Sequence, residues 1–300
     1  MSLTGPPAVA LAFALDRAAA EPPASLHPVA WFGRLVAPVD REWPAPRPVG
    51  LVAALALPLL AAGIVAALVR GAGALHPVAA AAVAGLALFV TTSLRMLLDE
   101  ARAVVAATDA HPDAARERLR SLAGRDASDL SPAQVRSAAV ESAAENLADG
   151  LVAPLFAFVL LAPVSVALGA GAAAWVKAVN TLDSMLGYRS KPVGWASARL
   201  DDLVMWLPAR LAAALLAAAA ANPDALLNAR RWAGAPPSPN SGWPMGALAS
   251  ALQVRLEKPG VYELNPMATL PTVGEATRGV TLVSRAGVLA YALAGVVAWP

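Results

Sequence analysis

Several common functional elements are absent from this 300-residue sequence. It contains no cysteine, which excludes disulfides, cysteine-ligated zinc, iron–sulfur clusters and a thiol nucleophile. Neither a GxxxxGK(S/T) P-loop nor a GxGxxG fingerprint after a strand occurs. The three histidines are scattered, without metal-ligand spacing or a Ser-His-Asp order. A net charge of +2 without a basic stripe argues against a nucleic-acid surface.

Charge is also scarce, and its scarcity predicts the fold class. Charged residues make up 15% of the chain and hydrophobic residues 58%, whereas about a quarter of the residues in soluble domains are charged. The composition predicts an all-α, polytopic integral membrane protein that forms a single membrane domain over residues 1–300. About twenty apolar residues cross a bilayer as a helix. Four stretches qualify as expected full spans: 3–20, 49–69, 75–94 and 280–299.

Two further apolar stretches are harder to assign. Residues 151–176 are interrupted by Pro154, Pro163 and a Gly169-Gly171 pair, and a full crossing would separate the flanking polar motifs by a bilayer. We therefore expect a re-entrant hairpin at 151–176, and an interfacial helix at 203–221, where Arg210 leaves too few apolar residues to span. A conventional six-span topology is the alternative.

Basic loops indicate which side of the membrane each polar segment faces. Lysine and arginine favour the cytoplasmic side, so residues 95–150 are expected to form a cytoplasmic helical segment in a cell-membrane protein. Within it a helix is expected to start at Ser131, a suitable N-cap, with Pro132 at the first helical position. Residues 177–202 and 222–279 are expected to be membrane-surface loops, with the site on the cytoplasmic side.

The densest polar stretch begins with ESAAENLADG. Glu141, Glu145 and Asp149 recur at helical spacing on one stripe, bordered by Asn146, and no lysine or arginine lies between them. A solvated helix face is the simpler interpretation. The alternative is a Mg²⁺ site, since oxygen ligands suit this ion beside phosphate groups.

Two further polar clusters follow the 151–176 segment. Lys177 is one of three lysines in the chain. With Asn180, Asp183, Ser184 and Tyr188 it forms a series of i+3 and i+4 relations, which predicts that all five lie on one helix face. It is interpreted either as a phosphate contact or as a lysine that snorkels to the membrane surface. The second cluster contains Arg199, Asp201 and Asp202, followed by Arg210 in register with Asp202, where an internal Asp–Arg pair is the alternative.

A polar loop near the N-terminus contains His27, Trp31 and Arg34 within eight residues. It is either an interfacial anchor or part of the same site. The pentapeptide LHPVA occurs at residues 26–30 and again at 75–79. In a chain this rich in alanine we interpret the repeat as coincidence.

Together these motifs resemble the CobD/CbiB family of cobalamin biosynthesis. The likeness is carried by HPVAWFGRL at 27–35, GRD at 124–126, AAVESAAENLADGLVAPLF at 138–156, AVNTLDSMLGY at 178–188, GWASARLDD at 194–202, PARL at 208–211 and PNSGWP at 239–244. The motifs follow one another in the family's order over most of the chain. The sequence departs from the family pattern at Leu147, Met205 and Met245, which puts the acceptor pocket in question.

The resemblance implies an ATP- and Mg²⁺-dependent carbon–nitrogen ligase, an adenosylcobinamide-phosphate synthase. Such an enzyme joins (R)-1-amino-2-propanol or its O-phosphate to adenosylcobyric acid, and an acyl-phosphate intermediate is expected. By position, the implied catalytic residues are Asp183, Asp201 and Asp202, and the implied metal ligands are Glu141, Glu145, Asn146 and Asp149. The implied substrate-binding residues are His27, Trp31, Arg34, Lys177, Asn180, Ser184, Tyr188, Arg189, Trp195, Arg199, Asn240 and Trp243.

The expected partners are the corrinoid, the aminopropanol compound, the lipid bilayer and other late cobalamin-assembly membrane enzymes, and no nucleic acid. A non-catalytic membrane scaffold or a transporter for corrinoid intermediates is the alternative, because broken helices with polar ends also form transporter sites.

Overall fold

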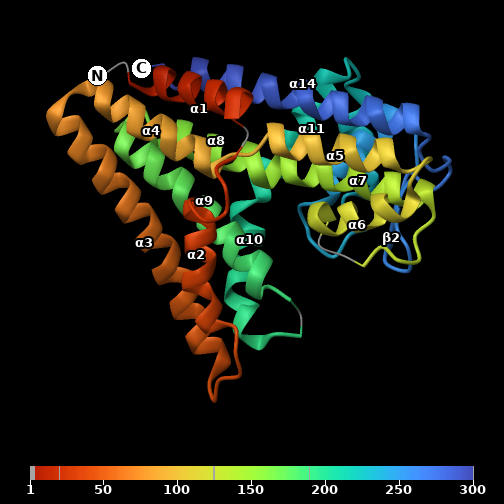
Figure 1. The fold of residues 1–300 in the computed structure, drawn as a ribbon, viewed down its shortest axis with the longest axis horizontal. Coiled ribbons are helices and arrows are strands. Elements are labelled where there is room, and N and C mark those ends of the chain that lie inside the picture. Colours follow the sequence, from red (N-terminus) through yellow and green to blue (C-terminus); the bar gives the residue numbers. More distant parts are fainter. Residues whose placement is uncertain (1–3, 20, 124–125, 189, 300) are drawn as a thin grey trace. The chain divides into compact units, whose positions relative to one another are not determined.

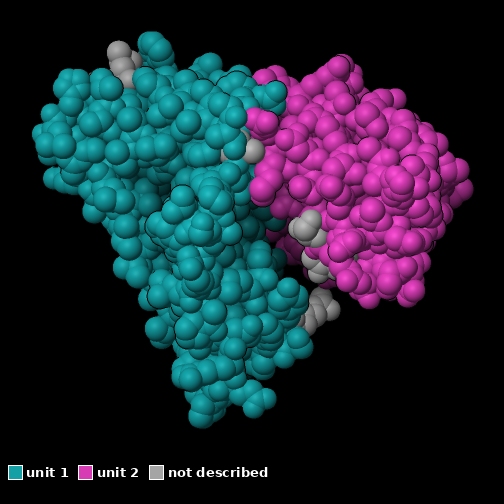
Figure 2. Space-filling view, viewed as in Figure 1, with its two compact units in different colours: residues 1–93, 149–205, 290–300 teal, residues 94–148, 206–289 magenta. Residues whose placement is uncertain are grey.

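The computed structural model describes residues 4–19, 21–123, 126–188 and 190–299 (Figure 1). These residues form a largely helical protein that divides into two compact units, coloured separately in Figure 2. Unit 1 comprises residues 1–93, 149–205 and 290–300, and unit 2 comprises residues 94–148 and 206–289. The expectation of a single domain stays a prediction.

Unit 1 is a set of packed helices. Its elements are α1 (Gly5–Ala19), α2 (Pro28–Val36), the 3₁₀ turn Ala37–Val39, α3 (Pro46–Leu75), α4 (Pro77–Thr91), α8 (Ala153–Leu161), α9 (Val166–Leu186), the 3₁₀ turn Pro192–Gly194 and α10 (Trp195–Val204). The end of α14 (Val273–Val297) also belongs to it. Helix α9 is central, since it packs against α2, α3, α4, α8 and α10.

Two glycines of α9 provide close helix packing. A Cβ on Gly169 would lie 2.9 Å from the Phe158 carbonyl oxygen of α8, and one on Gly171 would lie 3.0 Å from the Ala62 carbonyl oxygen of α3. The glycine pair that the sequence suggested as a helix interruption therefore lies inside a continuous helix, where it lets neighbouring backbones approach.

Unit 2 combines helices with a short β-hairpin. Its elements are α5 (Arg95–Ala107), α6 (Pro112–Ala123), α7 (Pro132–Leu147), α11 (Trp206–Ala219), α12 (Asp224–Trp232), α13 (Gly242–Leu252), β1 (Leu256–Lys258), β2 (Tyr262–Leu264) and most of α14. The strands are antiparallel, with Leu256 opposite Leu264. Helix α13 packs against α7, α11 and α12.

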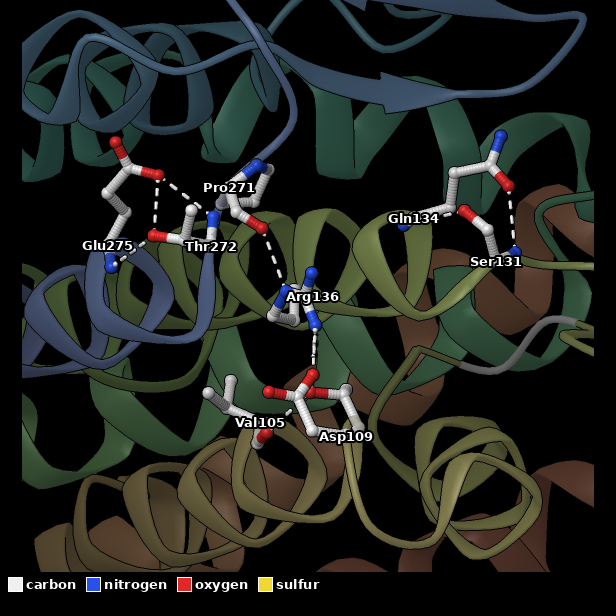
Figure 3. A network of polar contacts seen from close by, with 9 residues as sticks. Val105, Asp109, Ser131, Gln134, Arg136, Pro271, Thr272 and Glu275 are labelled. Carbon is white, nitrogen blue, oxygen red and sulfur yellow. Dashed lines mark hydrogen bonds and ion pairs between the residues drawn. The ribbon is translucent and has the colours of Figure 1, made fainter.

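Arg136 of α7 joins three segments of unit 2 (Figure 3). Its guanidinium lies 3.0 Å from a carboxylate oxygen of Asp109, just beyond α5, and donates to the Pro271 carbonyl, just before α14, at 2.8 Å. Helix α7 starts at the N-cap predicted at Ser131, and Gln134 completes a capping box with it (Figure 3).

The chain has four helical stretches long and apolar enough to cross a membrane: Pro46–Leu75, Pro77–Ala107, Pro132–Leu161 and Val273–Val297. This confirms the expected polytopic helical class and the number of spans, but not the identity of each one. Helix α1 is 15 residues long, about 22 Å at 1.5 Å per residue, which is short of the hydrocarbon thickness.

The expected re-entrant segment differs in detail. Helices α8 and α9 do form a packed hairpin, turning at residues 162–165, where Pro163 lies. Pro154 makes no break, because a π-helical turn, Ala148–Val152, precedes it. Since a proline cannot donate to the carbonyl four residues back, Gly150 accepts instead from the Ser93 amide at 2.9 Å.

A helix break occurs instead at Met205, between α10 and α11. Residues 192–204 and 206–219 are long and apolar enough to cross a membrane only when the two segments are counted together, as a broken span or a re-entrant loop. The expected interfacial helix at 203–221 corresponds to α11. The segments expected to be surface loops, 177–202 and 222–279, were assigned wrongly, because their polar residues lie largely on α9, α10, α12 and α13.

Candidate functional site

His27 begins α2 and has a clear local role. Its backbone is extended, Pro28 occupies the first helical position, and its Nδ1 accepts from the Val29 amide at 3.2 Å. An accepting Nδ1 places the proton of a neutral imidazole on Nε2. That nitrogen lies 3.5 Å from Glu21 Oε2, and the side chain is buried.

Lys177 lies close enough to His27 for their charges to interact. Burial lowers the pKa of His27, Glu21 opposes that shift, and Lys177 adds to it. Burial likewise lowers the pKa of Lys177, and the carboxylates of Glu21 and Asp149 oppose it. We call Glu21, His27, Asp149 and Lys177 the unit 1 polar cluster; it brings together three residues predicted from sequence and adds Glu21, which carried no motif signal.

The π-helical turn explains how Asp149 reaches this cluster. On a regular helix Asp149 would continue the stripe of Glu141 and Glu145. Residues 148–152 form a π-turn instead, which changes the register at this position. Asp149 belongs to unit 1 and interacts with Lys177, so the predicted three-carboxylate stripe does not continue through it.

An apolar cavity of about 90 Å³ lies beside Lys177. Its lining comes from α2, α3, α4 and α9 and includes Val29, Phe32, Thr91 and Thr181. Lys177 is the charged residue of this lining. Its half-buried ammonium group therefore lies between the apolar cavity and the carboxylates of Glu21 and Asp149. Such surroundings favour an anionic partner for the lysine.

Asp183 forms a second polar environment on α9. Burial, with a smaller effect of the Asp202 carboxylate, raises its pKa to about 6. Its Oδ1 has no hydrogen-bond partner among the described residues and lies against Gly187, where a side chain would collide with it. Burial also raises the pKa of Asp202, against the effect of Arg199, whose guanidinium lies 3.6 Å away.

Helix geometry separates this environment from Lys177. The two residues are six positions apart, which is about 240° around the helix and about 9 Å along its axis. Lys177 interacts with Glu21 and Asp149, and Asp183 with Asp202. The sequence prediction that α9 presents all its polar groups on one face is therefore wrong.

The Glu141 carboxylate, in unit 2, accepts hydrogen bonds from two other residues of the protein. One carboxylate oxygen accepts from the Ser137 hydroxyl and the other from the Tyr262 hydroxyl, both at 2.8 Å, and the side chain is buried. Ser137 in turn accepts from the Glu257 amide at 2.8 Å. This network fastens the β-hairpin to α7, a structural role that the sequence did not reveal.

Glu145 and Asn146 are half-buried on α7, and the Asn146 amide donates to the Ser142 carbonyl at 3.0 Å. In the described part of the chain, no group of three or more His, Asp or Glu side chains could hold a metal ion. Mg²⁺ commonly needs only one or two carboxylates when substrate phosphates complete its shell. Asp149 beside Lys177 fits that limited form, and a magnesium site stays a prediction.

Arg210 organises another predicted region within unit 2. Its guanidinium lies between two indoles, 4.3 Å from the ring centre of Trp206 and 4.9 Å from that of Trp243. It also donates to the Asn240 side chain at 3.0 Å. The predicted residues Asn240 and Trp243 thus share one arginine.

The remaining predicted residues are dispersed over unit 1. Trp31 is exposed and donates to the Ser25 carbonyl at 2.9 Å, and Ser184 donates to the Asn180 carbonyl at the same distance. The other predicted side chains are half-buried (Asn180, Asp201) or exposed (Arg34, Tyr188, Trp195), and Arg189 lies outside the described residues.

Comparisons with known proteins agree on one family. The CobD/Cbib protein family model matches residues 9–289. A probable cobalamin biosynthesis protein CobD from Methanothrix thermoacetophila is 38% identical over 299 residues, covering 94% of this chain and 93% of the relative. The cobalamin biosynthesis protein CobD of Klebsiella pneumoniae is 37% identical over 288 residues, covering 91% and 88%. No solved structure matches.

Proposed function

Because the chain belongs to the CobD/CbiB family of cobalamin biosynthesis proteins, we propose that it is the ligase of a late assembly step. In this proposal it joins (R)-1-amino-2-propanol or its O-phosphate to the carboxylate of adenosylcobyric acid at the expense of Mg·ATP. The observation that carries the proposal is the unit 1 polar cluster, where Lys177 lies beside two carboxylates and an apolar cavity.

Lys177 is assigned to a phosphate group. A lysine contacts phosphate as a compact point charge, and partial burial strengthens that attraction because water screens it less. His27 lies behind it as a positioning residue, held at the start of α2 by its cap and by Glu21. Bound Mg·ATP activates the acid, and Asp149 is the cluster's candidate contact to the metal.

Asp183 is assigned as the base that accepts the proton released during amide formation. Amide formation joins the amine nitrogen to the activated carboxyl carbon, expels phosphate and releases a proton from the nitrogen. A carboxylate with a pKa of about 6 is a better proton acceptor than an ordinary aspartate and stays ionised at neutral pH. Both residues lie on α9, about 9 Å apart along its axis but on different faces of the helix, so the substrate must extend around the helix to contact both.

The test is amide formation by purified protein in detergent. Adenosylcobyric acid, aminopropanol phosphate and Mg·ATP should yield adenosylcobinamide phosphate, ADP and inorganic phosphate, and the free amine in a parallel reaction identifies the preferred donor. Lys177→Gln and Asp183→Asn should each lose most of this activity, whereas Lys258→Gln, far along the sequence in β1, should keep it. Full activity in both site variants would refute the assigned residues, and absence of ATP turnover with every corrinoid would favour a scaffold or transporter.

A further inference from the structure

A groove in unit 2 lies apart in sequence from every motif discussed so far. It has a volume of about 440 Å³ and is lined on α14 by Thr277, Arg278, Thr281 and Arg285, and at the end of α11 by Ala219 and the following Ala220. The α14 residues recur every three or four positions, so they lie on one face of that helix. Both arginines are exposed, which leaves their guanidinium groups accessible to a ligand.

The positive charge of this groove is only partly offset by the protein, through an interaction between the charges of Arg278 and Glu275. In the described part of the chain neither Arg278 nor Arg285 forms an ion pair. Arg278 donates one hydrogen bond, to the Ala251 carbonyl at 3.0 Å, out of its five N–H groups. Glu275, one turn away, is held by Thr272, whose amide and hydroxyl both donate to it at 2.8 Å (Figure 3).

The position of the arginines along α14 adds a second argument. This helix is a candidate span that ends at Val297, and about twenty residues cross the hydrocarbon core. Twenty residues counted back from Val297 reach Arg278, so Arg278 falls at the membrane boundary and Arg285 about 10 Å deeper. An arginine at such a depth is costly unless it snorkels toward the interface or meets an anion.

We propose that this groove binds a phosphate group. Guanidinium groups recognise phosphate through paired hydrogen bonds, and the same lining includes the hydroxyl groups of Thr277 and Thr281. The phosphate can come from the headgroup of an anionic phospholipid or from a soluble phosphate ester. The position of the arginines at the membrane boundary favours the lipid.

The test measures binding of dioleoylphosphatidylglycerol, dioleoylphosphatidylcholine and inorganic phosphate to the full-length protein in detergent. Native mass spectrometry follows the lipids and thermal unfolding follows phosphate. The variant is Arg278→Gln with Arg285→Gln. Arg230→Gln with Arg231→Gln is the matched control, because it removes two exposed arginines from α12 of the same unit.

Phosphatidylglycerol should bind wild type and the α12 control equally and the groove variant about 30-fold more weakly, since each basic residue near an anionic surface contributes about fivefold. Arg285→Gln alone should lose about fivefold, which preserves the test if the double variant unfolds. If inorganic phosphate binds the wild type but not the groove variant, and phosphatidylglycerol binds no better than phosphatidylcholine, the natural ligand is a soluble phosphate ester. The proposal would be overturned if all variants bound the lipid equally and if phosphate changed the thermal unfolding of the groove variant as much as that of the wild type.

Discussion

The pentapeptide LHPVA occurs at the start of α2 and again at the start of α4, and the two copies share their local geometry. His27 and His76 both have extended backbones, both precede a proline at the first helical position, and both accept through Nδ1 from the amide two residues on, at 3.2 Å. The same pentapeptide therefore starts a helix in the same way at both places, and the interpretation of its recurrence as coincidence stays a prediction.

The two copies differ in what surrounds them. His27 is buried, with Nε2 3.5 Å from Glu21 and Lys177 close enough to lower its pKa. His76 is exposed. Local sequence thus specifies the cap, whereas tertiary packing specifies which histidine joins a charged cluster, and His76 is an internal control for His27.

The largest effect is expected at Lys177, the cation that distinguishes the His27 environment from that of His76. Lys177→Gln should lower the rate of amide formation by about 10²–10³-fold, the usual result of removing a group that stabilises developing charge. The measurement is ADP release at saturating corrinoid, with Lys258→Gln as the control. A tenfold or smaller loss would mean that the lysine serves packing or the membrane surface.

Asp183 is a second residue whose proposed role depends on its surroundings in the fold and not on its local sequence. Its ionised form is the proposed proton acceptor, so the rate should fall about tenfold per pH unit as pH drops below its pKa of about 6. The pH–rate profile of the wild type measures this limb, with tight pH control of the ATP supply reaction. A flat profile between pH 5 and 7 would exclude Asp183 as the base.

The ionisation of Asp183 should have opposite effects on rate and on protein stability: as pH rises, the rate increases and the stability decreases. Its folded pKa lies above the unfolded value of about 3.9, so the folded state binds the extra proton. Stability is therefore lost as pH rises from about 4 to 6. Asp183→Asn should reduce that slope in thermal unfolding, and Asp224→Asn on exposed α12 should not.

Much of the fold was readable from the sequence, because it depends on composition and local signals. Apolar runs predicted a polytopic helical protein, and Ser131-Pro132 predicted the start of α7. The identity of the spans was less accessible: α1 is too short, while α7 and α8 form a long apolar stretch only because a π-turn accommodates Pro154. A π-turn has no reliable sequence signature.

The candidate site was partly readable for a similar reason. Asp149, Lys177 and Asp183 could be selected from the sequence because they are polar residues in an otherwise apolar chain. In the structure each of them interacts with other charged groups. Glu21 escaped notice because nothing in its local sequence marks it as a partner of His27. The structural role of Glu141 was not readable, since its partner Tyr262 lies 121 residues away and no spacing rule connects them.

A moderate effect is expected when the imidazole of each copy is replaced but the cap is kept. Asparagine is among the best N-cap residues, so His27→Asn and His76→Asn should fold like the wild type. We expect about a tenfold loss of amide-forming activity for His27→Asn, in the range of a mispositioned reacting group, and none for His76→Asn. Similar losses in both would indicate that the cap residue acts through folding alone.

The smallest effect is expected when the caps themselves are removed. His27→Ala and His76→Ala should each lower stability by about 1 kcal/mol, because each leaves an amide of the first turn without its acceptor. His27→Ala should cost somewhat more, since it also empties a buried position. Thermal unfolding in detergent measures both, and His27→Ser and His76→Ser should restore the cap. If serine restores the activity of the His27 variant as well as its stability, the imidazole contributes nothing beyond starting α2, and the contrast between the two copies is one of burial alone.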